Sequence, residues 1–406
     1  MTPVLYVTRN GLLEPLGKSQ VFAYLKGLSS NYKITLITYE KIADLSDTPR
    51  FNALHQACKQ LGIRWLPQCF VPKPMIIAPA LSMIRMIWLV IYEVRTQGVK
   101  IIHARSYIPA VVALIVGRLT GVPFIFDMRA LWPEELITAG RLKRGSLLYR
   151  LIIISERACL RRAGAVVSLT QAAVQHIKQL YPAEMSRQTV AVIPTCADLE
   201  RFVPAAQAPE KIIIGCLGTV KSGWFRLDWL ATFLAVVAER DTNVCFEITT
   251  RDDPVIVRNA IGGGANLQSR LSIGPCPSDE VHKIIQRHTA SVMFFTQGLG
   301  KLGSSPTRMA EILGSGLPVV ANDGVGDVAV IIQKYRVGVL VSGPAETDMA
   351  NAFDALQNLL ADPELALRCR RAAEEVFSLE AGTGAYAALY EKVLIDEASK
   401  HREISV

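Results

Sequence analysis

The sequence predicts an α/β protein made of two doubly wound parallel-sheet domains, and three observations support this prediction. The chain has 406 residues, which is enough for two domains of about 150–200 residues that each bury a core. Short apolar runs that read as strands alternate with longer helical segments, as in repeated βα units. The alternation restarts at 212–215, directly after a segment at 204–211 that is rich in alanine and proline.

The first half of the chain opens with a strand at 4–8, a loop at 9–20 and a helix at 21–29. A strand, a glycine-containing loop and a helix can form half of a phosphate site, because free amides at the start of the helix point at the loop. A plain tight turn is the alternative, and the dinucleotide fingerprint G-x-G-x-x-G is absent. The remaining elements of this half are expected to be strands at 34–38, 63–66, 101–106 and 123–126 and helices at 75–97, 110–119 and 141–162.

The second half is expected to repeat the pattern around its own sheet. A Gly-Gly-Gly loop at 262–264 follows no strand and is expected to be a turn. The strands of this half are expected at 212–215, 244–249, 271–273, 292–295, 319–321 and 337–341, and the helices that cover them at 227–238, 348–361 and 363–376.

Polar side chains gather where two strands of the first half end. His103 and Arg105 close the strand at 101–106, and Asp127 and Arg129 follow the strand at 123–126. Ligands of parallel α/β sheets collect at the carboxyl ends of the strands, so these side chains mark a candidate cleft. A histidine at a strand end is more often a satisfied structural group, but here several polar groups converge.

A second candidate site lies in the segment 304–323. It opens with S-S-P-T-R, and hydroxyl residues before a proline are typical of a helix N-terminus, whereas Gly316 ends the helix. Free amides and the helix dipole attract anions there, and Arg308 adds a positive charge. Glu311, one turn deeper, is placed to hold a hydroxylated group. An ordinary helix–strand unit of an α/β domain is the alternative.

Charge is unevenly distributed along the chain. Residues 1–200 carry 24 Lys and Arg against 12 Asp and Glu, a net charge of +12, whereas 201–406 carry 20 against 24, a net charge of −4. A basic half indicates an anionic partner. We expect no nucleic acid, because the sequence contains no zinc finger, aromatic–basic repeat or basic tail. An anionic membrane surface fits the mean hydropathy of +0.27 better.

The segment 141–162 is the candidate for contact with that membrane. Seven basic residues interleave with leucine and isoleucine there, against Glu156 alone. Such a helix can bury one face and present the other to anionic headgroups, helped by the apolar segment 75–97. A charged face that contacts only water is the alternative. The predicted docking residues are Arg141, Lys143, Arg144 and Arg150.

The cysteines and the apolar runs of the sequence indicate the cellular compartment of the protein. Eight scattered cysteines include no Cys-x-x-Cys pair, which argues against a disulfide framework or a zinc site and favours free thiols in a reducing cytoplasm. No uncharged apolar run reaches the roughly 18–20 residues of a spanning helix, and the strand at 4–8 leaves no room for a signal peptide. We therefore expect a cytoplasmic protein that is peripheral on the inner face of the membrane.

Three segments resemble the GT-B glycosyltransferases, in particular the large retaining family 4. The pattern S-S-P-T-R-x-x-E-x-x-x-x-G-x-P-V-V-A at 304–321 resembles the donor-nucleotide motif of that family. The run D-M-R-A-L-W-P-E at 127–134 resembles a D/E-x-R-x-L-W-P-E signature of a branch associated with bacterial surface polysaccharide and O-antigen assembly. The segment 193–204 resembles the interdomain signature I-P-N-G-V-D-x-x-x-F-x-P, with Thr195 and Cys196 in place of Asn and Gly.

The resemblance implies a GT-B fold and a donor site built on a helix N-terminus. Two Rossmann-like domains would face each other across a cleft: an acceptor-side domain at 1–203, a donor domain at 204–376, and a terminal helix at 377–406 that returns to the first domain. A glutamate at the position of Glu311 holds the ribose hydroxyls in that family, whereas Gly303 stands where many members have a second glutamate that touches the transferred sugar. The residues expected to bind the donor are Gly17, Lys18, Lys221, Ser305, Thr307, Arg308 and Glu311.

The resemblance also implies the chemistry: transfer of a sugar from a nucleoside diphosphate sugar to a sugar or lipid-linked acceptor, with retention of configuration. The departing phosphate is thought to take the acceptor proton in this family, so no protein nucleophile is required. The expected catalytic residues are His103, Asp127 and Arg129, the last standing where many members have a histidine. No Asp-x-Asp occurs, so we expect neither a metal nor another cofactor. A GT-B isomerase of sugar nucleotides and a non-catalytic GT-B binding subunit are the alternatives.

Overall fold

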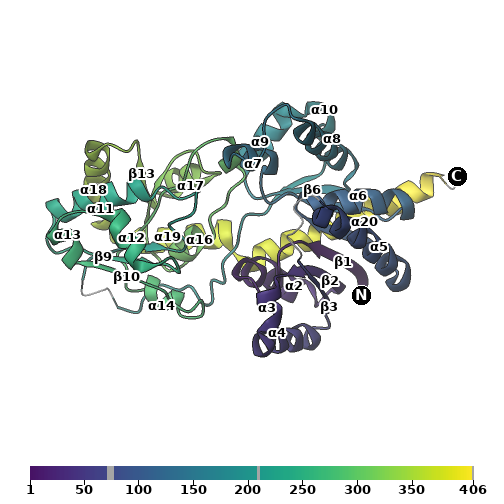
Figure 1. Ribbon diagram of the computed structural model, residues 1–406, viewed down its shortest axis with the longest axis horizontal. Coiled ribbons are helices and arrows are strands. Elements are labelled where there is room, and N and C mark those ends of the chain that lie inside the picture. Colours follow the sequence, from purple (N-terminus) through teal and green to yellow (C-terminus); the bar gives the residue numbers. More distant parts are fainter. Residues whose placement is uncertain (71–76, 208–210, 405–406) are drawn as a thin grey trace. The chain divides into compact units, whose positions relative to one another are not determined.

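The computed structural model describes residues 1–70, 77–207 and 211–404. The chain forms two compact α/β units, of which the first consists of Met1–Ile193 with Leu379–Val406 and the second of Pro194–Ser378. Each unit contains one parallel sheet with helices packed against it (Figure 1). Some predicted segments extend beyond the described residues: 75–76 of the expected apolar helix, 208–210 of the expected linker and 405–406 of the expected terminal segment.

The sheet of the first unit has seven strands, which are β1 (Thr2–Thr8), β2 (Tyr32–Glu40), β3 (Arg64–Cys69), β4 (Ile101–Arg105), β5 (Phe124–Asp127), β6 (Ala165–Ser168) and β7 (Val190–Val192). All neighbours are parallel, in the order β3-β2-β1-β4-β5-β6-β7. The central strands are buried on both faces, because helices cover both sides of a parallel sheet. The strand order reverses beside β1, so the ends of β1 and β4 lie at the topological switch point, where ligands of such sheets bind.

The helices of the first unit are α1 (Pro15–Gly17), the π-helical turn η1 (Lys18–Phe22), α2 (Ala23–Leu28), α3 (Ile42–Ser46), α4 (Thr48–Gln60), α5 (Ile77–Gln97), α6 (Tyr107–Thr120), α7 (Trp132–Thr138), α8 (Leu147–Arg162), α9 (Gln171–Leu180), α10 (Pro182–Met185) and α20 (Leu379–Ile404). Right-handed crossovers place α2 and α4 on one face of the sheet. The chain then runs back from β3 towards β6, so α5, α6 and α8 cover the other face, where α6 packs against both α5 and α8.

Two predicted helix starts in this unit are wrong. The first helix begins at Pro15 rather than at residue 21, because the fixed φ of proline suits a first helical turn. The basic helix begins later than predicted, at Leu147 rather than at residue 141. Gly145 adopts φ +81 and the Ser146 side chain accepts a hydrogen bond of 3.2 Å from the amide of Tyr149, which starts the helix there.

The second unit contains a six-stranded parallel sheet of β8 (Ile213–Leu217), β9 (Cys245–Thr249), β10 (Leu271–Gly274), β11 (Ala290–Met293), β12 (Val319–Asn322) and β13 (Gly338–Val341), in the order β10-β9-β8-β11-β12-β13. Its helices are α11 (Leu227–Arg240), α12 (Pro254–Ile261), α13 (Ala265–Ser269), α14 (Val281–Ile285), α15 (Leu299–Leu302), α16 (Thr307–Gly314), α17 (Val328–Tyr335), α18 (Glu346–Leu360) and α19 (Leu365–Phe377). The strand order again reverses beside the first strand, so both units have the predicted doubly wound architecture.

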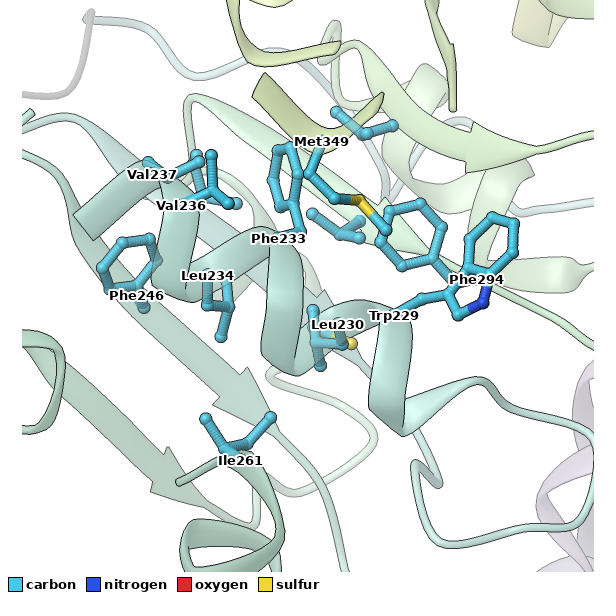
Figure 2. Close-up of a cluster of buried hydrophobic side chains, with 14 of the residues drawn as sticks. Trp229, Leu230, Phe233, Leu234, Val236, Val237, Phe246, Ile261, Phe294 and Met349 are labelled. Atoms are coloured by element: carbon cyan, nitrogen blue, oxygen red, sulfur yellow. The ribbon is translucent and has the colours of Figure 1, made fainter. Parts of the chain in front are cut away.

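The core of the second unit is built around α11. Leu230, Phe233, Leu234 and Val237 recur at the spacing of one helix face and are buried against the sheet, as Figure 2 shows. The Phe233 ring meets the ring of Phe294 edge-on, with centroids 6.0 Å apart. Aromatic and aliphatic side chains of this size provide most of the burial that holds a helix on a sheet.

The boundary between the units lies ten residues before the predicted one, at 193/194 rather than 203/204. The segment from Pro194 belongs to the second unit because it packs there: Phe202 is buried in that core, and the amide of Ala197 donates a 2.9 Å hydrogen bond to the carbonyl of Phe377. The second boundary lies at 378/379, two residues after the predicted 376/377.

Helix α20, yellow in Figure 1, completes the first unit. It packs against α2, where the ring of Tyr386 meets the ring of Tyr24 edge-on at a centroid distance of 5.2 Å. The Tyr386 hydroxyl donates a 3.1 Å hydrogen bond to Asp127 Oδ2, at the end of β5. The final helix of the chain is therefore held to the strand ends of the first unit by a buried polar contact.

We expect Phe233→Ala to weaken the second unit strongly. Replacing a buried phenylalanine by alanine costs about 3–5 kcal/mol, because the lost transfer free energy adds to the cost of a cavity. Hydrogen exchange followed by mass spectrometry should show a loss of that size in the opening free energy of amides in α11 and β9. The matched control is Val330→Ala on α17, where the side chain is exposed; equal effects of the two changes would contradict the core assignment.

We expect Tyr386→Phe to loosen α20 selectively. The change keeps the ring but removes a hydroxyl that donates to Asp127 and accepts from Arg129 Nη1 at 3.3 Å. Leaving buried polar partners unsatisfied costs about 1–3 kcal/mol. Hydrogen exchange should therefore accelerate in the first half of α20, whereas Tyr92→Phe, which alters an exposed tyrosine, should change nothing there. Unchanged protection of α20 in Tyr386→Phe would show that the hydrogen bond does not hold the helix.

Candidate functional site

The start of α16 lies beside the carboxyl ends of the strands in the second unit. Met309, Ile312 and Leu313 bury one face of this helix in the core, next to β12 and α19. The helix is preceded by Pro306 as N-cap residue, and no side chain caps it. The predicted hydroxyl cap is therefore wrong. The first-turn amides are left without the side-chain acceptor that usually occupies this position.

Ser305 is engaged elsewhere, which explains the absence of that cap. The Thr195 hydroxyl donates a 2.7 Å hydrogen bond to the Ser305 carbonyl and lies 3.0 Å from the Ser305 hydroxyl. The amide of Thr195 donates to the same hydroxyl at 3.3 Å. Thr195 thus fixes the entry into α16, and its place in the interdomain signature is structural here. Sequence reasoning missed this contact because the two residues lie 110 positions apart.

Arg308 occupies an aromatic slot at the first turn of α16. Its guanidinium carbon lies 5.2 Å from the ring centroid of Phe295 and 5.6 Å from that of Phe225, distances at which cation–π attraction operates. Gly218, with φ +85, makes room for it, because a Cβ there would lie 2.7 Å from Arg308 Nη2. Among the described residues, the buried Arg308 Nη1 meets no hydrogen-bond acceptor. The two rings and Gly218 therefore hold the guanidinium in place, while its Nη1–H group donates no hydrogen bond.

The loop that follows β8 is held in place by Asp252. Its Oδ2 accepts from the amide of Val220 at 2.7 Å, from the amide of Lys221 at 3.0 Å and from the Thr250 hydroxyl at 2.9 Å. Burial would raise the pKa of Asp252, but these hydrogen bonds hold its pKa below the usual range. The side chain of Lys221 itself is exposed. The loop is thus rigid while the predicted donor-binding lysine remains accessible.

Trp224 joins this loop to the segment that follows β11, and Asn322 joins that segment to β12. The carbonyl of Trp224 accepts a 3.0 Å hydrogen bond from the amide of Thr296, and Lys301 Nζ lies 3.9 Å from the centroid of the Trp224 ring. Asn322 exchanges hydrogen bonds with the backbone of Phe295, accepting at 2.8 Å and donating at 3.0 Å. Asp252 and Asn322 were not predicted, although both follow predicted strands, and the strand-end rule applied in the first half would have found them.

Glu311 lies one turn deeper in α16, as predicted. Burial raises its pKa to about 7, although the positive charges of Arg308 and Arg201 oppose the rise. A carboxyl with a raised pKa in the folded chain opposes folding when it ionises, so this contribution to stability is lost as the pH rises through about 7. Perturbed carboxyls of this kind are common at binding sites. Gly303, which ends α15, brings no carboxylate to this region.

In the first unit, the predicted phosphate loop is organised by a carboxylate that sequence reasoning missed. Glu40, at the end of β2, accepts from the amide of Leu12 at 2.7 Å and from the amide of Leu13 at 3.2 Å. A Cβ on Gly17 would lie 2.0 Å from the carbonyl oxygen of Gly11, so packing of the loop on the helix start already requires glycine. The predicted contact of Gly17 with a donor phosphate remains a prediction, as does that of the exposed Lys18.

The four predicted strand-end residues of the first unit do converge, around Asp127. Its Oδ2 lies 3.3 Å from His103 Nε2 and 3.7 Å from Arg105 Nη1, and its Oδ1 lies 3.8 Å from Arg129 Nη1. Burial would raise the pKa of Asp127, but Arg129, His103 and Arg105 hold its pKa below the usual range. Burial lowers the pKa of His103, so the imidazole is neutral near pH 7.

These residues do not line an open cleft as expected, because α20 covers them. His103 Nδ1 lies 2.8 Å from the Tyr390 hydroxyl, and Tyr386 bonds to Asp127. His103 and Asp127 have no exposed surface, so a direct contact with a substrate would require α20 to move. Arg129 retains 10% exposure of its side chain and adopts φ +60, a conformation that costs energy outside glycine.

The predicted docking residues fall into two groups. Arg141, Lys143 and Arg144 lie in the turn before α8, and Arg150 lies in its first turn. Arg144 Nη2 forms an ion pair of 2.6 Å with Glu134 Oε2, so this residue has a structural partner. Among the described residues, no group of three His, Cys, Asp or Glu side chains is arranged to hold a metal ion. None of the described helices is both long enough and apolar enough to cross a membrane.

The chain is similar to glycosyltransferases both in part of its sequence and in its fold. Residues 26–196 match the model of the glycosyl transferase 4-like domain, whereas no curated protein sequence matches the chain. A glycosyltransferase from Rickettsia africae ESF-5 superposes with a TM-score of 0.71 at 15% identity, covering 97% of this chain and 98% of that one. A sucrose-phosphate synthase from Thermosynechococcus elongatus gives 0.68 at 15%, covering 98% and 100%.

A third similar structure contains nucleotide sugar. Anabaena HepE in complex with UDP-glucose superposes with a TM-score of 0.67 at 14% identity, covering 96% of this chain and 100% of that one. Identities this low establish the fold alone. Together, the fold and the domain match support a sugar-transferring function and agree with the GT-B resemblance. The chain has the GT-B fold of these solved structures, and its residues 26–196 are similar to the glycosyl transferase 4-like domain.

Proposed function

We propose that this chain transfers a sugar from a nucleoside diphosphate sugar to an acceptor, with retention of configuration, in the assembly of a bacterial polysaccharide or glycolipid. The glycosyl transferase 4-like domain and the GT-B fold support the reaction class. The observation that carries the proposal is the unused buried donor of Arg308 at the uncapped start of α16. A cation and free helix amides at one point form a site for a diphosphate.

The donor diphosphate would be held from two sides within the second unit. Arg308 presents Nη1 from its aromatic slot, where the rings and Gly218 fix the direction of the guanidinium. Lys221 would reach the same phosphates from the loop that Asp252 fixes. Positive charge held in place before the reaction stabilises the leaving diphosphate without reorganisation at the moment of bond cleavage. This role requires no divalent cation and no other cofactor.

Glu311 would bind the ribose of the donor. Its ionised carboxylate can accept hydrogen bonds from two neighbouring hydroxyls, and each charge-assisted bond contributes about 1.5–3 kcal/mol. Because its pKa is about 7, binding would favour the ionised form and release a proton near neutral pH. Ser305 would act by positioning, since Thr195 ties it to the helix entry.

In the first unit we assign the catalytic role to Arg129, because its side chain retains 10% exposure. His103 and Asp127 are positioning residues in this proposal, because they are buried and Asp127 pairs with Arg129. The departing phosphate would take the acceptor proton on the face from which it leaves, so the protein supplies orientation and charge rather than a nucleophile. The acceptor would be a sugar, free or carried on a lipid.

Activity should be measured with a panel of nucleoside diphosphate sugars and the anomeric configuration of the product determined by NMR. We expect transfer from at least one donor, with the configuration retained and with activity preserved in EDTA, because basic side chains neutralise the diphosphate. Complete loss of activity in EDTA that a metal ion restores would contradict the charge assignment. An epimerised donor without any acceptor product would instead identify a sugar-nucleotide isomerase, and binding without turnover a non-catalytic subunit.

Donor affinity should depend on the ionisation of Glu311. With a pKa of about 7, the ionised share rises from about a tenth at pH 6 to about nine-tenths at pH 8. Calorimetric affinity for UDP-glucose, used as the probe, should therefore rise by about tenfold over that range. Glu311→Gln should bind at least tenfold more weakly at pH 8, with a flat pH profile.

The matched control is Glu346→Gln, which alters an exposed carboxyl at the start of α18 in the same unit. It should keep both the affinity and the pH profile of the original chain. If Glu311→Gln binds as tightly as the original chain at pH 8, the ribose assignment is wrong.

A further inference from the structure

Large apolar side chains are exposed in an unusual concentration on three helices of the first unit. Of the 22 large hydrophobic residues exposed in the described chain, nine lie on α5, α6 and α8, which pack side by side on one face of the sheet. They are Leu81, Ile84, Trp88, Tyr92, Leu119, Leu147, Leu148, Leu151 and Ile154. Monomeric soluble proteins rarely expose contiguous apolar patches larger than a few hundred Å².

On α5 the exposed residues form one continuous stripe. Leu81, Ile84, Trp88 and Tyr92 recur at intervals of three or four residues, so at 3.6 residues per turn they fall within an arc of about 100°. Trp88 is 69% exposed and Tyr92 is 59% exposed. The opposite side of the helix is buried in the unit, so the stripe points away from the core. One apolar face of the helix therefore packs against the rest of the unit, and a second apolar face is exposed and available to a partner.

The charges around this stripe have one sign. Both carboxylates on α5, α6 and α8 are buried: Glu93 pairs with Arg64, and Glu156 accepts hydrogen bonds from Tyr107 and Tyr181. Each exposed charged residue of these helices is a cation, namely Arg85, Arg95, Arg118, Arg150, Arg157, Arg161 and Arg162. Arg95 lies within the arc of the α5 stripe, and Arg85 lies beside its edge. The surface thus combines exposed apolar residues with positive charge alone.

Some of these cations form ion pairs within the protein, whereas others remain available to bind an anionic partner. Arg157 and Arg161 both bind Glu184, at 2.8 and 3.0 Å, and Arg144 binds Glu134. Within the described chain, no ion pair engages Arg85, Arg95 or Arg150, or Arg141 and Lys143 in the turn before α8. Arg118 on α6 and Arg162 at the end of α8 likewise form no ion pair within the described chain. The available set therefore spans α5, α6 and both ends of α8, and the predicted docking residue Arg144 is not part of it.

We propose that the docking surface, which consists of α5, α6, α8 and the turn at 141–146, attaches the chain to an anionic phospholipid bilayer. Aromatic and aliphatic side chains would enter the headgroup region while the arginines bind lipid phosphates. A second copy of the chain fits less well, because a twofold contact through this face would set cations against cations. The proposal is independent of the donor site, and it supplies a reason for a lipid-carried acceptor.

Vesicle co-sedimentation at low salt tests the proposal with the full chain. Binding to vesicles containing phosphatidylglycerol should exceed binding to phosphatidylcholine alone, and it should fall as salt rises, because headgroup contacts are screened. Trp88→Ser with Tyr92→Ser should lower the partition coefficient by about tenfold or more. Arg85→Gln, Arg95→Gln and Arg150→Gln together should lower it by at least as much, because each change removes a cation that attracts anionic headgroups. The triple change should also flatten the salt dependence.

The matched control replaces three exposed lysines elsewhere in the unit, Lys26→Gln, Lys33→Gln and Lys59→Gln, which lie on α2, β2 and α4. Because net charge changes equally, this variant should bind like the original chain. Brominated lipids should quench fluorescence of the original chain and quench Trp88→Phe much less. The proposal fails if the original chain stays in the supernatant, if the control loses as much binding as the arginine variant, or if Trp88→Ser dissociates a dimer without affecting vesicles.

Discussion

The second unit is organised around Arg308, whose buried Nη1 meets no hydrogen-bond acceptor among the described residues. Burial lowers the pKa of Arg308 without neutralising a guanidinium, so the charge persists where water has limited access. The rings of Phe225 and Phe295 and the glycine at 218 fix its direction, and Asp252 and Asn322 hold the loops that carry those rings. Several independent contacts thus maintain a donor that the described protein does not satisfy. Such an arrangement costs free energy in the free protein and is expected where a ligand supplies the missing acceptor.

In the first unit, the charged side chains at the strand ends face one another. Its strand-end charges are paired with one another, since Asp127 lies near His103, Arg105 and Arg129 and accepts a hydrogen bond from Tyr386. Arg105 Nη1 and Asp127 Oδ1 nevertheless form no hydrogen bond within the described chain. Two tyrosines of α20 cover the cluster. The same polar residues that suggest a cleft in the sequence therefore secure the last helix of the chain. Arg129, with its left-handed backbone and partial exposure, is the member of the cluster that retains a surface. The unit also exposes the apolar and basic surface on α5, α6 and α8.

The sequence was sufficient for the doubly wound class of both units, although β6 and β7 of the first unit were not predicted. The predicted strands of the second unit lie within two residues of the observed ones, because buried parallel strands are nearly continuous apolar runs. Helix starts were less predictable, since Pro15 and Ser146 act through local turns that periodicity does not reveal. The position of Glu311 followed from the motif at 304–323. The roles of Ser305, Glu40 and Tyr386 did not, because each depends on a partner at least 27 residues away along the chain. Burial of His103 could not be foreseen for the same reason: the covering helix lies 287 residues later.

The central claim is that Arg308, at the start of α16, binds the diphosphate of the donor. The most direct measurement is an NMR titration with UDP that follows the Nε–H resonance of Arg308, assigned by its absence in Arg308→Lys. The resonance is predicted to shift and to saturate with UDP, whereas that of Arg258, which is bonded to the backbone carbonyl of Leu271 in the same unit, should not move. If UDP binds the chain while the Arg308 resonance stays in place, the donor site lies elsewhere and the claim is wrong.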